Sequence, residues 1–340
     1  MRIVAFFVLF FGLIGCRESV QPTLVDKPVE VRRPQSFPPF EFPADNRPTA
    51  LRIQLGRQLF YDTRLSSSNA IHCGSCHVLS AAFTDGRATS PGIAGIAGRR
   101  NAPTLANVAW MKRFMMEGGV PTLETQALAP LHDSLEMGTN MMRAVHRLNE
   151  DGDLKALAKA AYGRDSIDPF VVTRALACFQ RTFVSGDSRY DRFLLGQKDQ
   201  INEHELRGRD LFFSERTQCG SCHGGVFFTD MEYHNIGLYA VYSDEGKARA
   251  THLPGDVGKF KTPTLRNIQL TSPYMHDGSI ASLEEVIAFY NRGGEPHINR
   301  DVRVRALQLS KQECDDLLAF LMTLTDWNFV QQKDLLPLER

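Results

Sequence analysis

The sequence lacks an excess of charge of either sign. Its 340 residues carry 39 Lys and Arg against 39 Asp and Glu, so the formal net charge is zero. Chains that bind nucleic acid through its phosphates are typically basic. The charge balance therefore argues against a nucleic-acid partner.

Long apolar runs are also scarce. The run Ile3–Ile14 follows Arg2 and is too short for an ordinary membrane-spanning helix. It ends in Leu13-Ile14-Gly15-Cys16, which resembles a lipobox. We expect residues 1–16 to be a lipoprotein signal peptide. Cys16 would then anchor an exported, periplasmic protein to the membrane; the alternative is an ordinary signal peptide with a chance cysteine.

Strand signals are few, and helical periodicity dominates. Ser282 and Glu285 have the spacing of a capping box, and apolar residues follow at helical intervals from Leu283. Ser310 and Glu313 open a second predicted helix. Residues 17–49 are rich in proline without periodicity and predict a tether.

The most specific motif is CGSCH, which occurs at Cys73–His77 and again at Cys219–His223. A C-x-x-C-H run attaches a c-type haem: the cysteines bond the porphyrin and the histidine binds iron. A zinc site would need two C-x-x-C pairs about fifteen to twenty residues apart, and these lie much farther apart. The predicted haem-binding residues are Cys73, Cys76, His77, Cys219, Cys222 and His223. Of the other cysteines, Cys178 and Cys314 lie in apolar helix-like stretches and are predicted to be buried thiols.

The chain repeats itself around these motifs. Gly56–Tyr61 recurs as Gly208–Phe213, and Pro103-Thr104-Leu105 recurs as Pro263-Thr264-Leu265. We therefore predict a mainly α protein made of two tandem cytochrome c-like haem domains that arose by internal duplication. Their expected bounds are residues 50–196 and 197–340.

What lies opposite each histidine decides whether an iron can react. Residues 89–104, after the first motif, contain no histidine, methionine, tyrosine or cysteine. The repeat aligns Gln126 with Val286 and Pro130 with Tyr290. The sequence thus predicts an open first haem and a second haem closed by Tyr290. Alternatives are a purely structural tyrosine, or ligation by Met275, Tyr274 or His297.

Peroxide cleavage also requires a group that moves a proton between the two oxygens. Glu136 follows the predicted first-domain helix and is a candidate, with Gln126 as its orienting partner. A glutamate on the surface with no catalytic role is the alternative from spacing alone.

Residues 50–330 resemble the bacterial di-haem cytochrome c peroxidases and the related MauG enzymes. The matching stretches include Leu55–Asp62, Arg100–Thr104, Thr262–Ile268, Ser272–Gly278 and Ser185–Asp191. The resemblance implies peroxide chemistry at the first haem, with Gln126 and Glu136 as catalytic residues. It also implies one calcium ion held by Asn101, Thr271 and Pro273, and places Arg266 near the haems, on a propionate.

Three positions depart from the usual pattern of the peroxidases. Ile93 stands where many of them have a histidine that blocks the first haem, so no reductive activation is expected. Tyr290 stands at the position of their methionine ligand, as in MauG enzymes. Met116 replaces a tryptophan between the haems; Trp110 is close in sequence, but core packing is its favoured role.

The predicted function is reduction of hydrogen peroxide, with electrons from a small cytochrome c or cupredoxin passing through the second haem. The first alternative is MauG-like oxidation of a protein substrate. The second is a tethered two-haem electron carrier, which would need both irons to have two protein ligands.

Overall fold

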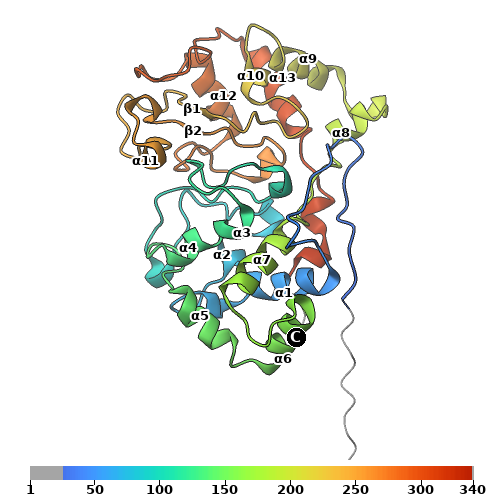
Figure 1. Cartoon of the computed structure of the whole chain (residues 1–340). Helices are drawn as coiled ribbons and strands as arrows, with labels where there is room; N and C mark the ends of the chain where they lie inside the picture. Colours follow the sequence, from blue (N-terminus) through green and yellow to red (C-terminus); the bar gives the residue numbers. More distant parts are fainter. Residues whose placement is uncertain (1–25, 339–340) are drawn as a thin grey trace, which may run out of the picture.

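The structure is a computed structural model that describes residues 26–338. Helices joined by long loops form two halves, each built around one CGSCH motif (Figure 1). The helices of the first half are α1 Ala50–Phe60, α2 Cys73–Cys76, α3 Leu123–Gln126, α4 Leu128–His132, α5 Met141–Leu148, α6 Gly152–Tyr162 and α7 Pro169–Gln180. Those of the second are α8 Arg189–Leu194, α9 Glu203–Phe212, α10 Cys219–Cys222, α11 Ala248–Thr251, α12 Leu283–Arg292 and α13 Lys311–Met322.

The expected helix signals are confirmed. Ser282 caps α12 by accepting a hydrogen bond from the backbone N–H of Glu285, and Ser310 and Glu313 form a capping box at the start of α13. Within residues 26–338 the strands are limited to β1 (Tyr233–His234) and β2 (Phe260–Lys261), which pair antiparallel. The prediction of a mainly helical protein is correct.

Each half contains the same close helix pair. In the first half α1 packs on α7 at Gly56, where a Cβ atom would lie 1.9 Å from the carbonyl oxygen of Ala175. In the second half α9 packs on α13 at Gly208, where a Cβ atom would lie 1.8 Å from the carbonyl oxygen of Asp316. Only glycine allows these approaches, so the repeated glycines have matching packing roles.

The predicted tether is wrong for residues 26–49. These residues, here called the N-terminal strap, run along both halves of the molecule (Figure 1). Phe37 and Asn46 are almost fully buried in the structure, at 2% and 0% exposure. A tether would leave all of these side chains in solvent, whereas Val31, Phe37, Asn46 and Pro48 are buried. Residues 1–25, with the predicted signal peptide and Cys16, lie outside the described part.

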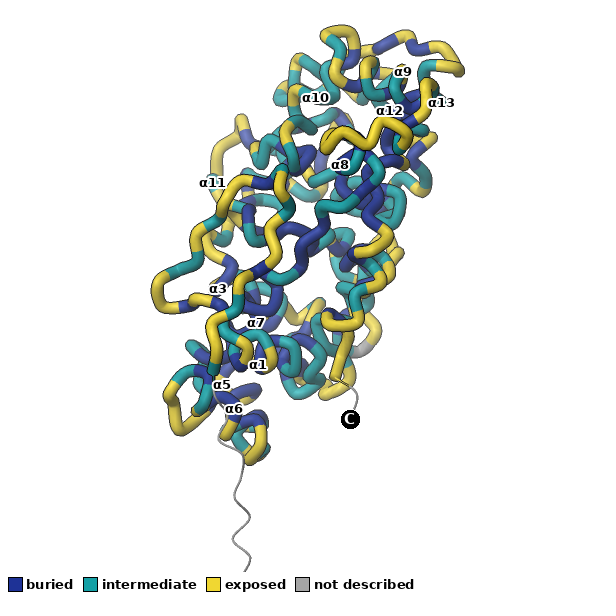
Figure 2. Tube along the Cα trace, turned by 90° about the vertical axis from the view of Figure 1, so that its right-hand side faces the viewer, coloured by how far each residue is buried: buried dark blue, intermediate teal, exposed yellow. Residues whose placement is uncertain are grey.

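The predicted second domain also needs a correction at its end. After α13 the chain returns to the first half, close to α1 (Figure 1). There Phe329 is fully buried in the first-half core, and Tyr61 donates a hydrogen bond to the carbonyl oxygen of Leu335 at 2.6 Å. Buried residues run through the centre of both halves (Figure 2). No helix within residues 26–338 is long and apolar enough to cross a membrane.

Candidate functional site

The two CGSCH motifs line one cavity of about 540 Å³ that extends through both halves. Each motif begins with a single helical turn, α2 or α10, followed directly by its histidine. All six predicted haem-binding residues of the motifs contribute to the wall. The remaining wall is mostly apolar, with side chains such as Leu131, Ile287 and Leu321.

The two histidines are held in the same way. Nδ1 of His77 lies 2.8 Å from the carbonyl oxygen of Phe83, and Nδ1 of His223 lies 3.2 Å from that of Phe228. Both phenylalanines have positive φ angles, 63° and 51°, which are strained for a bulky residue. The strained turns direct a carbonyl at Nδ1, and this arrangement fixes the tautomer that offers Nε2 to a metal.

These residues fit a haem at each motif. Burial raises the pKa of Cys73 to about 12, so its thiol is uncharged and enclosed in an apolar wall. Burial also lowers the pKa values of His77 and His223, which keeps the imidazoles neutral and able to bind iron. An apolar cavity with paired thiols and an oriented imidazole on each side matches the needs of a covalently attached porphyrin.

Gln126, Pro130 and Glu136 of the first half line the cavity, and their roles stay predictions. Gln126 ends α3, and its Nε2 lies 3.9 Å from the sulfur of Met115. Glu136 remains solvent-accessible, yet burial, and then the negative charge of Asp133, raise the pKa of its carboxyl. A carboxyl with a raised pKa holds a proton more readily than an exposed glutamate, which suits a group that accepts and returns one.

Val286, Ile287 and Tyr290 of α12 line the cavity on the second-half side. Burial raises the pKa of Tyr290, so a phenolate there would need a cation beside it. Two rival ligands are engaged elsewhere: the hydroxyl of Tyr274 donates to the carbonyl oxygen of Ile268 at 3.0 Å, and Nδ1 of His297 accepts from the backbone of Asn299 at 3.0 Å. Met275 lines the cavity and stays a geometric alternative.

The three predicted calcium ligands line the same cavity, and the calcium site stays a prediction. Asn101, Thr271 and Pro273 all line the cavity, although they lie far apart in sequence. Nδ2 of Asn101 donates to the carbonyl oxygen of Arg87 at 2.7 Å, which leaves its Oδ1 available as an acceptor. Amide and backbone carbonyl oxygens are the donor types that calcium prefers.

The predicted contact of Arg266 with a haem propionate stays a prediction, and the structure gives its guanidinium a protein partner. It does not line the cavity. Its guanidinium forms a bidentate ion pair with Asp191, with both N–O distances 2.8 Å, and Nε donates to the carbonyl oxygen of Val226 at 2.6 Å. Arg266 and Asp191 are 2% and 3% exposed, so the pair is structural and fixes α8 to the second half.

Sequence reasoning missed several residues of the cavity wall. Lys261 lines it, and burial lowers the pKa of its ammonium group to about 8. His276 stacks on Phe260 with ring centroids 3.9 Å apart. No spacing rule links these residues to the motifs, because they reach the cavity from loops and the short β2 strand. Met116 lines the cavity, whereas Trp110 lies in a separate buried cluster.

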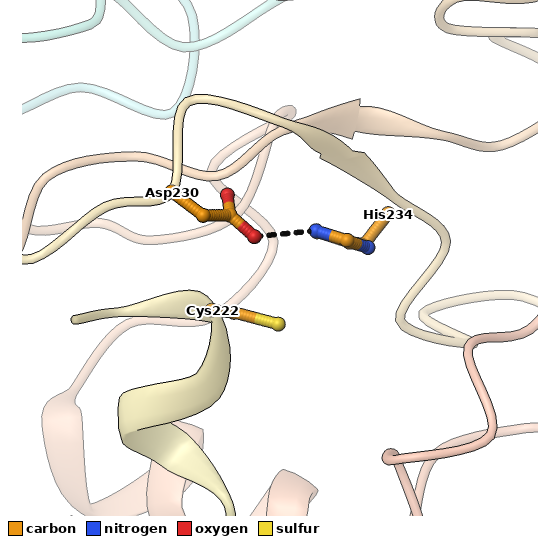
Figure 3. A group of neighbouring side chains, drawn as sticks. All are labelled: Cys222, Asp230 and His234. Atoms are coloured by element: carbon orange, nitrogen blue, oxygen red, sulfur yellow. Dashed lines mark hydrogen bonds and ion pairs between the residues drawn. The ribbon is translucent and has the colours of Figure 1, made fainter.

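Cys222, Asp230 and His234 form a polar group beside the second motif (Figure 3). His234 lies between two carboxylates, 2.8 Å from Asp230 and 2.9 Å from Asp301. Hydrogen bonding to Cys222 and then to Asp230 raises the pKa of His234 to about 9. Because Cys222 belongs to a haem attachment motif, its sulfur is not available as a ligand for a separate metal ion.

Known proteins share this arrangement of motifs. Residues 50–199 match the family described as di-haem cytochrome c peroxidase. The methylamine utilization protein MauG of Methylorubrum extorquens is 36% identical over 309 residues, covering 90% of this chain and 86% of that protein. The cytochrome c551 peroxidase of Nitrosomonas europaea is 34% identical over 276 residues, covering 80% of this chain and 79% of its own. The chain belongs to the di-haem cytochrome c peroxidase family.

Solved structures agree with this membership. A MauG-like protein associated with microbial copper homeostasis is 38% identical, with a TM-score of 0.86 over 90% of this chain and 98% of that chain. The dihaem peroxidase BthA from Burkholderia thailandensis has the same fold, with a TM-score of 0.74 over 87% of this chain and 91% of its own, at 24% identity. The protein is therefore an oxidoreductase of the di-haem family, and membership implies one c-type haem at each CGSCH run.

Proposed function

We propose that the protein reduces hydrogen peroxide at the first CGSCH site and receives electrons through the second. The asymmetry of the cavity carries this proposal. At the positions that the repeat aligns, the first half has Gln126 and Pro130, which do not bind iron strongly, whereas the second half has Val286 and Tyr290. The two sites thus have different chemical environments despite identical motifs.

A haem held by His77 supplies an iron that binds peroxide and exchanges electrons with it. The carboxylate of Glu136 takes the proton from the inner oxygen and delivers it to the outer oxygen, which leaves as water. The amide of Gln126 donates a hydrogen bond that orients the bound molecule. Two electrons and two protons complete the reduction of one peroxide to two waters.

Tyr290 is proposed as the second ligand of the iron held by His223. The apolar neighbours Val286 and Ile287 exclude water from that face. A phenolate donates more charge than a thioether and favours the oxidised iron. The second haem is then suited to hold an oxidising equivalent.

Oxidation of a residue in a partner protein is the second candidate function. Tyr290 and the 36% identity to MauG favour it. A small cytochrome c or cupredoxin is the expected donor in the first candidate, and a protein side chain in the second. The same proposal includes two tandem haem domains that arose by duplication, and a calcium ion held by Asn101, Thr271 and Pro273. It also includes a periplasmic location with a lipid anchor on Cys16.

The oxidised, haem-loaded protein tests the proposal spectroscopically. We expect one high-spin haem and one low-spin haem, and steady turnover of peroxide with reduced cytochrome c. Two low-spin haems would instead indicate the two-haem electron carrier. Peroxide consumption without turnover of cytochrome c or cupredoxin would favour oxidation of a protein substrate.

A further inference from the structure

The helix that carries Gln126 is too short to be stable alone. Helix α3 spans Leu123–Gln126 and joins α4 through Ala127, whose backbone is also helical, and so short a helical segment is unfavourable in water on its own. Leu123 and Ala127 bury its apolar side in the first-half core. Its position therefore depends on tertiary contacts, and the direction of Gln126 depends on that position.

The other side of α3 borders a hollow. A second cavity of about 340 Å³ lies there, between the N-terminal strap and the helix. Glu41, Phe42 and Pro43 of the strap line it, together with Thr122, Glu124 and Arg181. Because the space behind the helix is not filled, the polar contacts made there contribute to its position.

Glu124 makes those contacts. Its carboxylate pairs with Arg181, with N–O distances of 2.6 and 3.1 Å, and accepts a hydrogen bond from Nδ2 of Asn46 at 2.9 Å. Burial alone would raise the pKa of Glu124, but Arg181 and Asn46 hold it below its ordinary value. The carboxylate is thus ionised and anchored at two points.

Asn46 is itself held from several directions. It is 0% exposed. Its Nδ2 also donates to the carbonyl oxygen of Arg174 at 3.0 Å, and its Oδ1 accepts from the hydroxyl of Tyr162 at 3.2 Å. These contacts fix the amide against α6 and α7, so its bond to Glu124 has a defined direction.

We propose that Asn46 of the N-terminal strap is a positioning residue for Gln126. Residues two apart on a helix point roughly 200° apart around its axis. Glu124 and Gln126 are two residues apart on α3 and therefore point in nearly opposite directions. Glu124 is held towards the strap, while Gln126 lines the haem cavity. By fixing Glu124, Asn46 sets the rotation of α3 and so the direction of the Gln126 amide. The inference rests on the proposed role of Gln126 towards a ligand of the first haem.

The test measures cyanide binding to the oxidised, haem-loaded protein by optical titration. Cyanide stands in for a small polar ligand of the first haem. We expect Gln126→Ala and Asn46→Ala each to weaken cyanide binding about tenfold, the loss of one hydrogen bond. The double variant should be no weaker than Gln126→Ala alone, because a residue that acts only through Gln126 has no effect once that amide is gone.

Asp45→Ala is the matched control. Asp45 precedes Asn46 on the strap and pairs with Arg174 from an exposed position, so its loss should leave cyanide affinity unchanged. If Asn46→Ala does not fold, Asn46→Ser serves in its place: the shorter hydroxyl keeps a polar group but cannot reach Glu124.

Two results would overturn the inference while leaving the role of Gln126 intact. One is a variant of Asn46 that lowers thermal stability but binds cyanide as the unaltered protein does. The other is an equal weakening by Asn46→Ala with and without Gln126. If Gln126→Ala itself leaves cyanide affinity unchanged, the proposed function fails at that residue, and the inference fails with it.

Discussion

The ring of Phe37 stands edge-on to Trp110, with ring centroids 5.2 Å apart. Phe37 also meets Phe227 of the second half at 4.8 Å, and the guanidinium of Arg266 lies 4.7 Å from its ring centroid. Nε1 of Trp110 donates to the carbonyl oxygen of Pro38 at 2.8 Å. The N-terminal strap thus places one aromatic side chain between the two halves.

Replacing Phe37 with alanine should destabilise the protein by about 3–5 kcal/mol, because a large buried ring is lost from a packed interface. Urea unfolding of the haem-loaded protein measures this. Phe40→Ala is the control, since Phe40 packs on Trp110 but is only half-buried, and should cost clearly less. Equal losses from the two substitutions would contradict a central role for Phe37.

Replacing Glu136 with glutamine should slow the reaction with peroxide by about a hundredfold or more, because the amide cannot take up and return the proton. Stopped-flow mixing with peroxide gives the rate. Glu150→Gln, an exposed change on the same half, is the control. A Glu136→Gln variant that reacts as fast as the unaltered protein would remove Glu136 from the proton transfer.

The same reaction should depend on pH through Glu136. Its pKa is raised above the ordinary 4.5, so the carboxyl becomes protonated at a higher pH than an exposed glutamate. Since only the carboxylate can accept the proton, the rate should fall as pH is lowered through this raised pKa. The fall should disappear in Glu136→Gln; if it persists unchanged, another group titrates.

Much of this site could be predicted from the sequence because covalent haem attachment needs a fixed local spacing. The CGSCH runs, and the repeat that aligns Pro130 with Tyr290, locate both sides of the cavity. The strap could not be predicted in the same way. Its proline-rich sequence has no periodicity, and the burial of Phe37 and Asn46 depends on partners distant in sequence.

The ion pair of Arg266 could not be predicted for a related reason, and its contact with a haem stays a prediction. The position of Arg266 in its motif suggested a place near the haems but gave no sign of Asp191, which forms an ion pair with it. Lys261 is the opposite case: it belongs to no motif, and only the folded structure shows that it lines the cavity. Local spacing therefore identified the haem-attachment residues. The long-range ion pairs and the other residues of the cavity wall could be identified only from the fold.

Replacing Asp191 with alanine should cost about 3–5 kcal/mol of stability, because it leaves the buried guanidinium of Arg266 without a partner. The visible spectra of both haems should stay unchanged, since the pair lies outside the cavity wall. Asp187→Ala removes a more exposed pair with Arg192 and should cost less than about 1 kcal/mol. A shifted haem spectrum in Asp191→Ala would support the prediction that Arg266 contacts a haem.

Replacing Tyr290 with methionine should raise the reduction potential of the second haem, because a thioether stabilises reduced iron better than a phenolate does. Potentiometric titration followed by visible spectra measures the shift, and the first haem serves as internal reference. Tyr274→Phe is the matched control: its hydroxyl is bonded to Ile268, so its loss should leave the reduction potential unchanged.

Replacing Tyr290 with phenylalanine should leave the second iron without its tyrosine ligand and convert it towards high spin, which the visible spectrum measures. If Tyr290→Phe keeps a low-spin second haem, the ligand is another residue, and Met275 on the cavity wall becomes the candidate.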